Sequence, residues 1–380
     1  MALSVYQLLS NNRSSLFTVY FVLFVIQKYH ASAAAGLDAF SAAYVSASLI
    51  SPIAGRLSDR MGERRTLLLV AEAISLPFFV SIPFAPSFLE VSLLFLIAET
   101  LLSIGQTALN AFIADITPTT ERGRGYGFVN AVGSAGAVAG TFVAGIVAQI
   151  FGLDAIFYMV GVLGIGTILL VLFAIPVHHL PKSESRRKPL REMKGLAVFS
   201  ITTSIRTLGT GAVIAFLGTY ASILHANSFE VSLVAISGQA TTVLLGTLLG
   251  RQVDQLGEIR AYVLGSTIVV FSLIVYVVAN AWYELIPAQI IYYVGFNLLS
   301  PAMLSWVTKT APENRKAEYL GFFSMINSTL WSIGPVPGGI AEAKYGTLGL
   351  FSYAVGTTMI SVGSVYLIYS KKPQTKRAVL

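Results

Sequence analysis

Five ionisable side chains lie inside long apolar stretches of this sequence: Arg13, Lys28, Glu72, Glu99 and Arg206. A charge at the centre of a lipid bilayer costs at least about 2.5–3.5 kcal/mol on insertion scales, so such residues are usually retained for function. Glu99 stands midway along its stretch and is the strongest candidate, because a buried carboxyl group can exchange its proton for a ligand or for a cation. The alternative is a static ion pair or a hydrogen-bonded buried acid. Glu72 lies nearer the end of its stretch, which favours an interfacial or packing role.

Two of the cations, Arg13 and Arg206, occupy matching places about 194 residues apart, each on the first apolar stretch of one half of the chain. If both face a central cavity together with Lys28, that cavity is positive and favours an anionic or zwitterionic ligand. Lys28 could instead extend to the outer membrane interface, and Arg13 to the inner one. The sequence leaves both arrangements open.

The chain repeats itself. Residues 55–65 return as residues 250–260, 195 residues later, and each copy separates two apolar stretches. Two further patterns, a turn with a proline and arginines and a glycine-rich apolar stretch, return at almost the same offset. Three matches at one period indicate two homologous membrane halves joined in tandem.

Glycines and prolines mark two candidate hinge helices, one in each half. A bend at such residues would let a helix rock, whereas the alternative is tight packing against a neighbouring helix. The candidate hinge residues are Gly140, Gly145, Gly334, Pro335, Gly338 and Gly339.

Composition points to lipid as the solvent for most of the chain. Of its 380 residues 55% are hydrophobic and only 11% are charged, and the mean hydropathy is +0.73. This is more apolar surface than one soluble core of that size could hide. The net charge of +7 does not indicate a nucleic-acid-binding face, because the cations lie between apolar spans. With no cysteine, the chain has neither disulfides nor thiol chemistry.

The apolar stretches predict an all-α membrane protein with twelve transmembrane helices, each near the length of about 20 residues that a bilayer requires. Their continuous apolar runs lack the alternation of barrel strands. The expected spans are 5–29, 36–57, 66–84, 89–113, 126–149, 153–176, 195–222, 229–250, 261–281, 284–307, 319–341 and 347–369.

Lys and Arg set the expected orientation. Most of the 25 cations fall in the even-numbered loops and the tail, which places both termini in the cytoplasm. The first span has no basic segment before it and is not read as a cleavable signal peptide. The expected parts are a first six-helix bundle over 1–176, a cytoplasmic linker over 177–194, a second bundle over 195–370 and a cytoplasmic tail over 371–380.

The loop after the second span carries a recognisable signature. Its residues Gly55, Asp59, Arg60 and Gly62 resemble the signature loop of the major facilitator superfamily, and the resemblance extends over essentially the whole chain. The glycine-rich fifth span is similar to a motif of the drug and sugar proton antiporter branches of that family. The resemblance implies two pseudo-symmetric six-helix bundles, with a substrate path between them and alternating access.

The same loop predicts a gate. Gly55 permits close helix approach, and Asp59 can meet the positive amino end of a neighbouring helix. Arg60, Arg64 or Arg65 can pair with Asp115 after the fourth span. By resemblance, this cluster latches the outward-facing state. The alternative is that its cations only follow the positive-inside rule.

Polar and aromatic side chains on the expected cavity helices could contact a substrate. Tyrosine and tryptophan stack on sugars and on apolar drugs, yet they also occur in interfacial belts and helix contacts. These candidates are Gln106, Asn110, Tyr220, Tyr293, Asn297, Asn327 and Trp331. His30 and His225 occupy matching places at outer helix ends, and without a third ligand they favour hydrogen bonding over a metal site.

No sequence pattern supports an enzyme, since nucleotide-binding glycine loops, metalloprotease motifs and nucleophile elbows are lacking. The sequence therefore predicts a secondary active transporter in the cell membrane that exports a small organic solute in exchange for protons. The alternatives are uptake of a sugar, organic acid or other anion, and a receptor or scaffold that does not transport. The expected protein is a monomer without a metal, cofactor or nucleic-acid partner.

Overall fold

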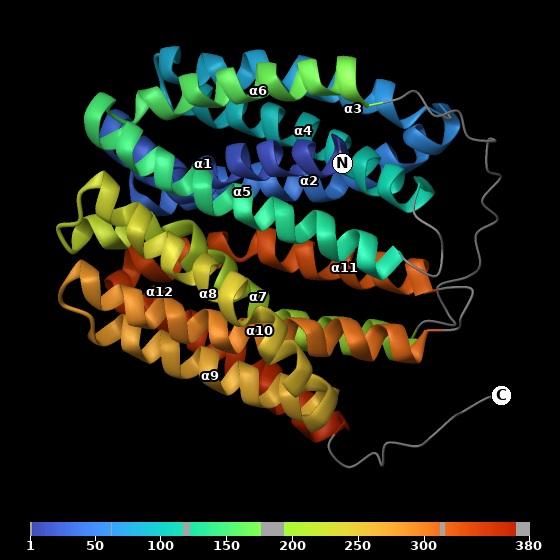
Figure 1. Cartoon of the computed structure of the whole chain (residues 1–380). Helices are drawn as coiled ribbons and strands as arrows, with labels where there is room; N and C mark the ends of the chain where they lie inside the picture. The colour runs from blue at the N-terminus through green and yellow to red at the C-terminus, as the bar shows by residue number, and fades with distance from the viewer. Residues whose placement is uncertain (1, 62, 117–121, 176–193, 312–315, 370–380) are drawn as a thin grey trace. The chain divides into compact units, whose positions relative to one another are not determined.

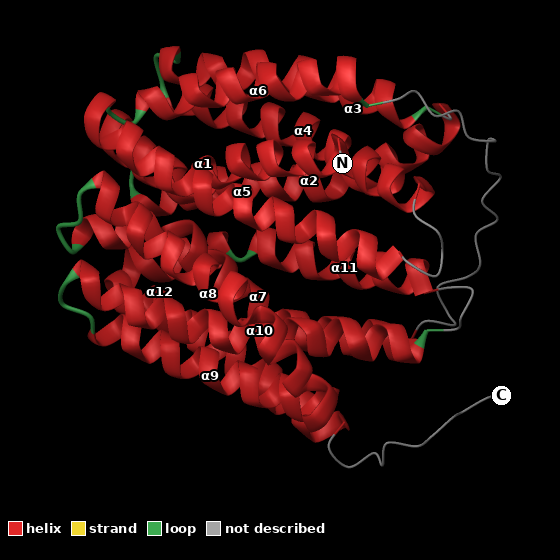
Figure 2. Ribbon diagram, in the orientation of Figure 1, coloured by secondary structure: helices red, strands yellow, loops and turns green. Residues whose placement is uncertain are grey.

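The computed structural model describes residues 2–61, 63–116, 122–175, 194–311 and 316–369, and every regular element in these ranges is helical (Figure 2). The elements, labelled in Figure 1, are α1 (Ala2–Tyr29), α2 (Ala33–Met61), α3 (Arg64–Ser81), η1 (Ile82–Phe84), α4 (Phe88–Ile116), α5 (Arg122–Phe151), α6 (Asp154–Ala174), α7 (Lys194–Ile223), α8 (Ser228–Leu256), α9 (Glu258–Val278), η3 (Trp282–Glu284), α10 (Leu285–Thr310), α11 (Lys316–Ile333) and α12 (Pro335–Tyr369). The expected all-α fold is confirmed.

Ten segments of the described chain have the length and apolar character needed to cross a membrane. The last of them, Tyr319–Tyr369, contains Gly346, whose φ of 68° is not helical and divides α12 into two helical parts. The helix α1 is additional to the ten and carries the charged residues Arg13 and Lys28. Because the last segment contains both α11 and α12, the ten segments and α1 together are consistent with the twelve expected transmembrane helices.

Left-handed residues end helices at matching places in the two halves. His30 has a φ of 52° and His225 a φ of 65°, and both follow the first helix of their half. Histidine tolerates this region better than most residues with a side chain. After α7 the amide of Ala226 donates to the carbonyl of Ala221 at 3.0 Å, a bond that closes the helix end. The two histidines thus serve as backbone turns.

The chain forms two compact units that are described separately. The first contains the described part of Met1–Lys188 together with Ile214–Gln239, and the second contains the described part of Pro189–Val213 together with Ala240–Leu380. In the first unit α1 packs on α5 and α6, α2 on α4, and α3 on both α4 and α6 (Figure 1). In the second unit α9 packs on α10 and α12.

Glycines permit the closest helix contacts in both units. A Cβ atom at Gly136 of α5 would overlap the main chain of Leu8 in α1, and one at Gly334 would overlap the main chain of Leu208 in α7. The candidate hinge residue Gly140 faces Asn12 in the same way. Small residues let helix backbones approach in this manner inside membranes.

The other candidate hinge residues also lie in contacts. Gly145 faces Ser232, and Gly338 faces Ala212. Pro335 and Gly339 are buried as well. The described structure therefore places these residues in tight packing, which was the alternative to a hinge, and whether they also bend during transport stays a prediction.

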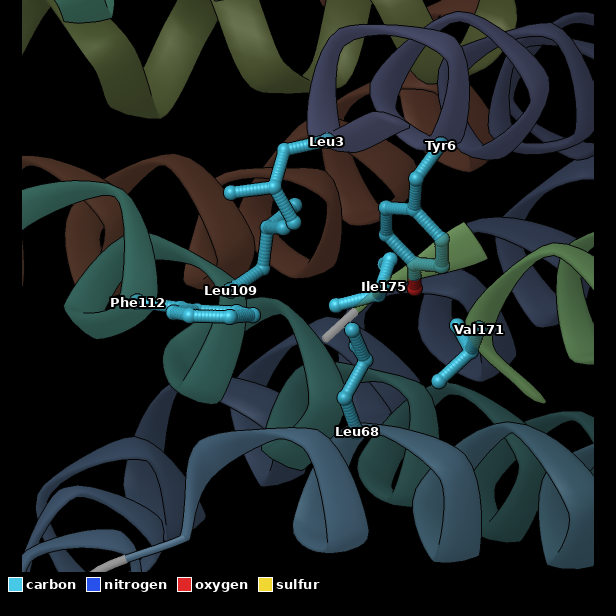
Figure 3. Packing of buried hydrophobic residues seen from close by; sticks show 7 residues of the cluster. All are labelled: Leu3, Tyr6, Leu68, Leu109, Phe112, Val171 and Ile175. Carbon is cyan, nitrogen blue, oxygen red and sulfur yellow. The ribbon is translucent and has the colours of Figure 1, made fainter. Parts of the chain in front are cut away.

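An apolar cluster in the first unit joins four helices. Figure 3 shows its residues from α1, α3, α4 and the end of α6: Leu3, Tyr6, Leu68, Leu109, Phe112, Val171 and Ile175. All are nearly or fully buried. The ring of Tyr6 belongs to this cluster while its hydroxyl group bonds a buried charge, so apolar packing positions the polar site described next.

Candidate functional site

The centre of the first unit holds a buried ion pair between Arg13 of α1 and Glu72 of α3. Arg13 Nη1 donates to Glu72 Oε2 at 2.7 Å, and Nη2 donates to Oε1 at 3.1 Å. Both side chains are fully buried. A planar guanidinium group in this two-bond arrangement fixes both the distance and the orientation of its partner. The sequence alone does not indicate that these two residues form a pair.

Two hydroxyl groups complete the surroundings of Glu72. Tyr6 donates to Glu72 Oε1, and Thr167 of α6 donates to Glu72 Oε2 at 3.4 Å. The carboxylate thus receives bonds from α1 and α6 in addition to the guanidinium group. A buried charge needs such bonds in place of the water it has lost. The sequence signal for this pair is a buried charge of opposite sign in each of the first and third apolar spans.

Glu99 of α4 lies beside this pair without joining it. Its side chain is 5% exposed, and its Oε1 atom has no hydrogen-bond partner among the described residues. The charge of Glu99 acts on Arg13 and on the hydroxyl group of Tyr44. Arg13 Nε is also buried without a partner in the described part of the chain. The sequence correctly places Glu99 in a buried position, and its role in proton coupling stays a prediction.

Lys28 lies in the interfacial arrangement that the sequence left open. Its Nζ atom donates to Asp154 Oδ1 at 2.7 Å and to the carbonyl oxygen of Pro83 at 2.6 Å. The lysine side chain is 30% exposed. Tyr29 donates to the carbonyl oxygen of Ala85 at 2.8 Å. These bonds tie the end of α1 to the start of α6 and to the turn before α4.

Arg206 of α7 is the buried cation of the second unit. It is 3% exposed, its Nε atom has no hydrogen-bond partner among the described residues, and no Asp or Glu within those residues forms a salt bridge with it. Its charge acts on Tyr262 and Tyr292. Tyr262 donates to the carbonyl oxygen of Thr203 at 3.0 Å. Arg206 is therefore surrounded by phenol groups where Arg13 has a carboxylate.

The remaining candidate contact residues divide between the units. In the first unit Gln106 donates to Ser10 Oγ at 2.6 Å, and Tyr220 is buried. In the second, Asn297 donates to Thr242 Oγ1 at 2.9 Å, and to the main-chain oxygen of Tyr293 at 2.7 Å.

Two more candidates lie in the second unit. Ser204 donates to Asn327 Oδ1 at 3.3 Å, and the main chain of Trp331 faces Gly211. The side chain of Asn110 lies outside the described residues. The described partners fit roles in helix contacts, and substrate contact stays a prediction for this whole set.

The predicted gate is described only in part. Arg64 donates to Ser58 Oγ at 2.7 Å and is nearly buried. Arg65 donates from Nε to the carbonyl oxygen of Val171 at 3.0 Å, and from Nη2 to that of Leu172, so it caps the end of α6. The side chains of Asp59, Arg60 and Asp115, the packing around Gly55 in α2, and the residue Gly62 lie outside what the structure describes.

Replacement of Glu72 by Gln is expected to destabilise the protein, because it removes the buried carboxylate that accepts both hydrogen bonds from the terminal nitrogen atoms of Arg13. The expected cost is about 3–5 kcal/mol. It would be measured as a lower midpoint of thermal unfolding in detergent. The control is Glu90→Gln, an exposed acid at the start of α4. An unchanged midpoint for Glu72→Gln would show that the pair does not hold the unit together.

Comparison with known proteins identifies the family. The model of the Major Facilitator Superfamily matches residues 3–200 and again 199–379, so one copy falls on each half. Multidrug resistance protein 1 of Bacillus subtilis (strain 168) is 25% identical over 345 residues, which are 87% of this chain and 85% of that protein. Quinolone resistance protein NorA of Staphylococcus aureus (strain MSSA476) is 24% identical over 306 residues, 76% of this chain and 75% of its own.

A solved structure shows the same fold. The crystal structure of a D-xylose-proton symporter superposes with a TM-score of 0.80 and 14% identity, covering 99% of this chain and 97% of the symporter. The match of the family model over both halves, the helical fold and the apolar spans agree. The chain is an integral multi-pass membrane protein that belongs to the Major Facilitator Superfamily of transporters.

Proposed function

We propose that this transporter exports small organic solutes in exchange for protons. Two curated relatives that match most of the chain are named for resistance to multiple drugs or to quinolones, which supports export of an organic compound. The chain would work by alternating access as a monomer in the cell membrane, without a nucleic-acid partner. Its two six-helix bundles, over 1–176 and 195–370, would be joined by the linker 177–194, and both termini would be cytoplasmic.

The observation that carries the proposal is the environment of Glu99. A carboxyl group that is 5% exposed and has one oxygen atom without a partner in the described chain is not held as a permanent ion pair. In a site of low dielectric constant such a group can bind or release a proton when its surroundings change. Glu99 is thus our candidate for the proton-binding residue, and proton entry would be linked to solute exit.

We also propose the latch inferred from the signature loop. Asp59 would bind the amino end of a neighbouring helix, and Arg60 or Arg64 would pair with Asp115. Charged contacts of this kind are weak singly, so breaking one shifts a balance between two states without unfolding the protein.

A second candidate function is uptake of an organic acid or other anion, and Arg206 favours it. Its charge is buried without a carboxylate partner among the described residues, so an anionic ligand that reached it would supply the missing counter-charge. The D-xylose-proton symporter has the same fold, which is compatible with uptake as well as export.

Replacement of Glu99 by Gln is expected to abolish proton-coupled transport, because glutamine cannot carry a proton between the two sides. The assay is quinolone movement in proteoliposomes with an imposed pH gradient and a pH-sensitive dye. We expect at least a tenfold loss of gradient-driven transport, equivalent to about 1.4 kcal/mol or more. Glu90→Gln, on the same helix but exposed, should retain coupling. Full coupling in Glu99→Gln would remove this residue as the proton site.

Replacement of Asp59 by Asn is expected to favour the inward-facing state, because it weakens the latch. Loss of about 1 kcal/mol would raise the inward-facing population roughly fivefold. The natural chain has no cysteine, so a single Asn110→Cys substitution can report access from the cytoplasmic side. Asp38→Asn, which changes an exposed acid on the same helix, is the control and should leave the labelling rate unchanged. Equal labelling rates with and without Asp59→Asn would contradict the latch.

Replacement of Arg206 by Gln is expected to abolish stabilisation by an anion if the second function holds. The probe is benzoate, and the measurement is the midpoint of thermal unfolding with and without it. A gain of a few degrees in the natural protein should disappear in Arg206→Gln and persist in Arg260→Gln, which changes an exposed cation. Stabilisation by a lipophilic cation, and none by benzoate, would exclude the anion candidate and leave drug export.

A further inference from the structure

Two buried hydrogen-bonding atoms without a partner among the described residues belong to Arg13 of α1 and Glu99 of α4, two helices that are in contact. Arg13 binds Glu72 through its two terminal nitrogen atoms and leaves Nε buried without a partner among the described residues. Glu99 Oε1 is likewise buried without a partner there. One atom is a donor and the other an acceptor, and the charges of Glu99 and Arg13 interact. The Nε–H group of Arg13 is therefore available to donate a hydrogen bond to a second acid.

The second half of the chain serves as an internal comparison. Gly152 and Gly346, with φ of 84° and 68°, begin the last helix of each half and lie about 194 residues apart. At the same offset Glu72 corresponds to Ser266 and Glu99 to Tyr293. Among the described residues, the charges of two acids act on Arg13, whereas none forms a salt bridge with Arg206.

This difference argues against a purely structural role for both acids. The second half keeps its arginine buried with hydroxyl and phenol neighbours, so the fold does not require an acid at either place. Ser266 is fully buried, which means that the corresponding position is also interior there. The two acids of the first half thus serve something that the second half does not perform.

We propose that Arg13 is a shared counter-ion that remains on Glu72 and binds Glu99 through Nε whenever Glu99 has lost its proton. This inference rests on the proposed function, because it assumes that Glu99 exchanges the transported proton. Arg13 acts as a positioning residue, and Glu72 holds its guanidinium plane in place. The proton on Glu99 thereby controls a direct contact between α4 and α1.

The net charge of the network depends on whether Glu99 carries a proton. With Glu99 protonated, Arg13 and Glu72 neutralise one another, and the hydroxyl groups of Tyr6 and Thr167 donate to Glu72. When Glu99 releases its proton, one extra negative charge stands next to Arg13 and Tyr44. The Nε–H group of Arg13 then donates to that carboxylate, and return of the proton breaks the bond.

Two variants should shift the pH dependence of transport in opposite directions. Glu72→Gln leaves the whole charge of Arg13 to Glu99, so the carboxylate forms more readily and the pH of half-maximal proton-driven transport falls by about one unit. The double variant R13M/E72M removes the cation without leaving a buried charge unpaired, so that pH rises by about one unit. Glu90→Gln changes an exposed acid at the start of α4 that takes no part in this network, and it should leave the profile unchanged.

The measurement is quinolone transport in proteoliposomes across a range of pH. Shifts of opposite sign support the shared counter-ion, whereas unchanged profiles, or two shifts of the same sign, overturn it. If Glu72→Gln does not fold, R13M/E72M decides alone, and an unshifted profile in it overturns the inference. Absence of proton movement in the natural protein and in Glu90→Gln would instead refute the proposed function, so the two failures are distinguishable.

Discussion

The first unit depends on one electrostatic interaction, the ion pair between the fully buried side chains of Arg13 and Glu72. Two hydrogen bonds of 2.7 and 3.1 Å join the two groups. Three helices are thereby held in register, because Arg13 belongs to α1, Glu72 to α3 and the supporting hydroxyl of Thr167 to α6. The apolar cluster around Tyr6 reinforces the same arrangement, since its ring packs in the cluster and its hydroxyl group bonds Glu72 (Figure 3). Because the pair is already neutral, it does not require Glu99, whose Oε1 atom has no hydrogen-bond partner among the described residues.

The two halves of the chain share their helix packing more closely than they share their buried acids. Left-handed histidines follow the first helix in both halves, and glycines bring the fifth and first helices, and their counterparts, into main-chain contact. A helix that crosses lipid must satisfy its backbone internally, so these features of packing are needed twice. The acids are not needed twice, and serine and tyrosine stand in their places in the second half.

Proline and glycine act together where the eleventh helix is interrupted. Pro335 has no N–H group, so the carbonyl oxygen of Trp331 receives no helical hydrogen bond from it. That oxygen faces Gly211, where the missing side chain lets α7 approach. Prolines and glycines at these places are compatible with a hinge and with a packing surface. The structure shows close packing between α7 and α11, because a Cβ atom at Gly211 would overlap the Trp331 oxygen.

The sequence by itself determined the class of the protein: long apolar spans that require helices in lipid, a period of about 194 residues that requires two halves, and the signature loop of the family. Each of these is a local or periodic property of the sequence, so it can be recognised without knowledge of the contacts between helices. Only the tertiary structure decided which charges meet. In the structure Arg13 forms a salt bridge with Glu72, and Lys28 forms one with Asp154. The charge of Arg206 instead acts on the phenol group of Tyr262. The rotation of each helix about its own axis sets these partners, and mostly apolar helices carry too weak a polar pattern along the chain to reveal it.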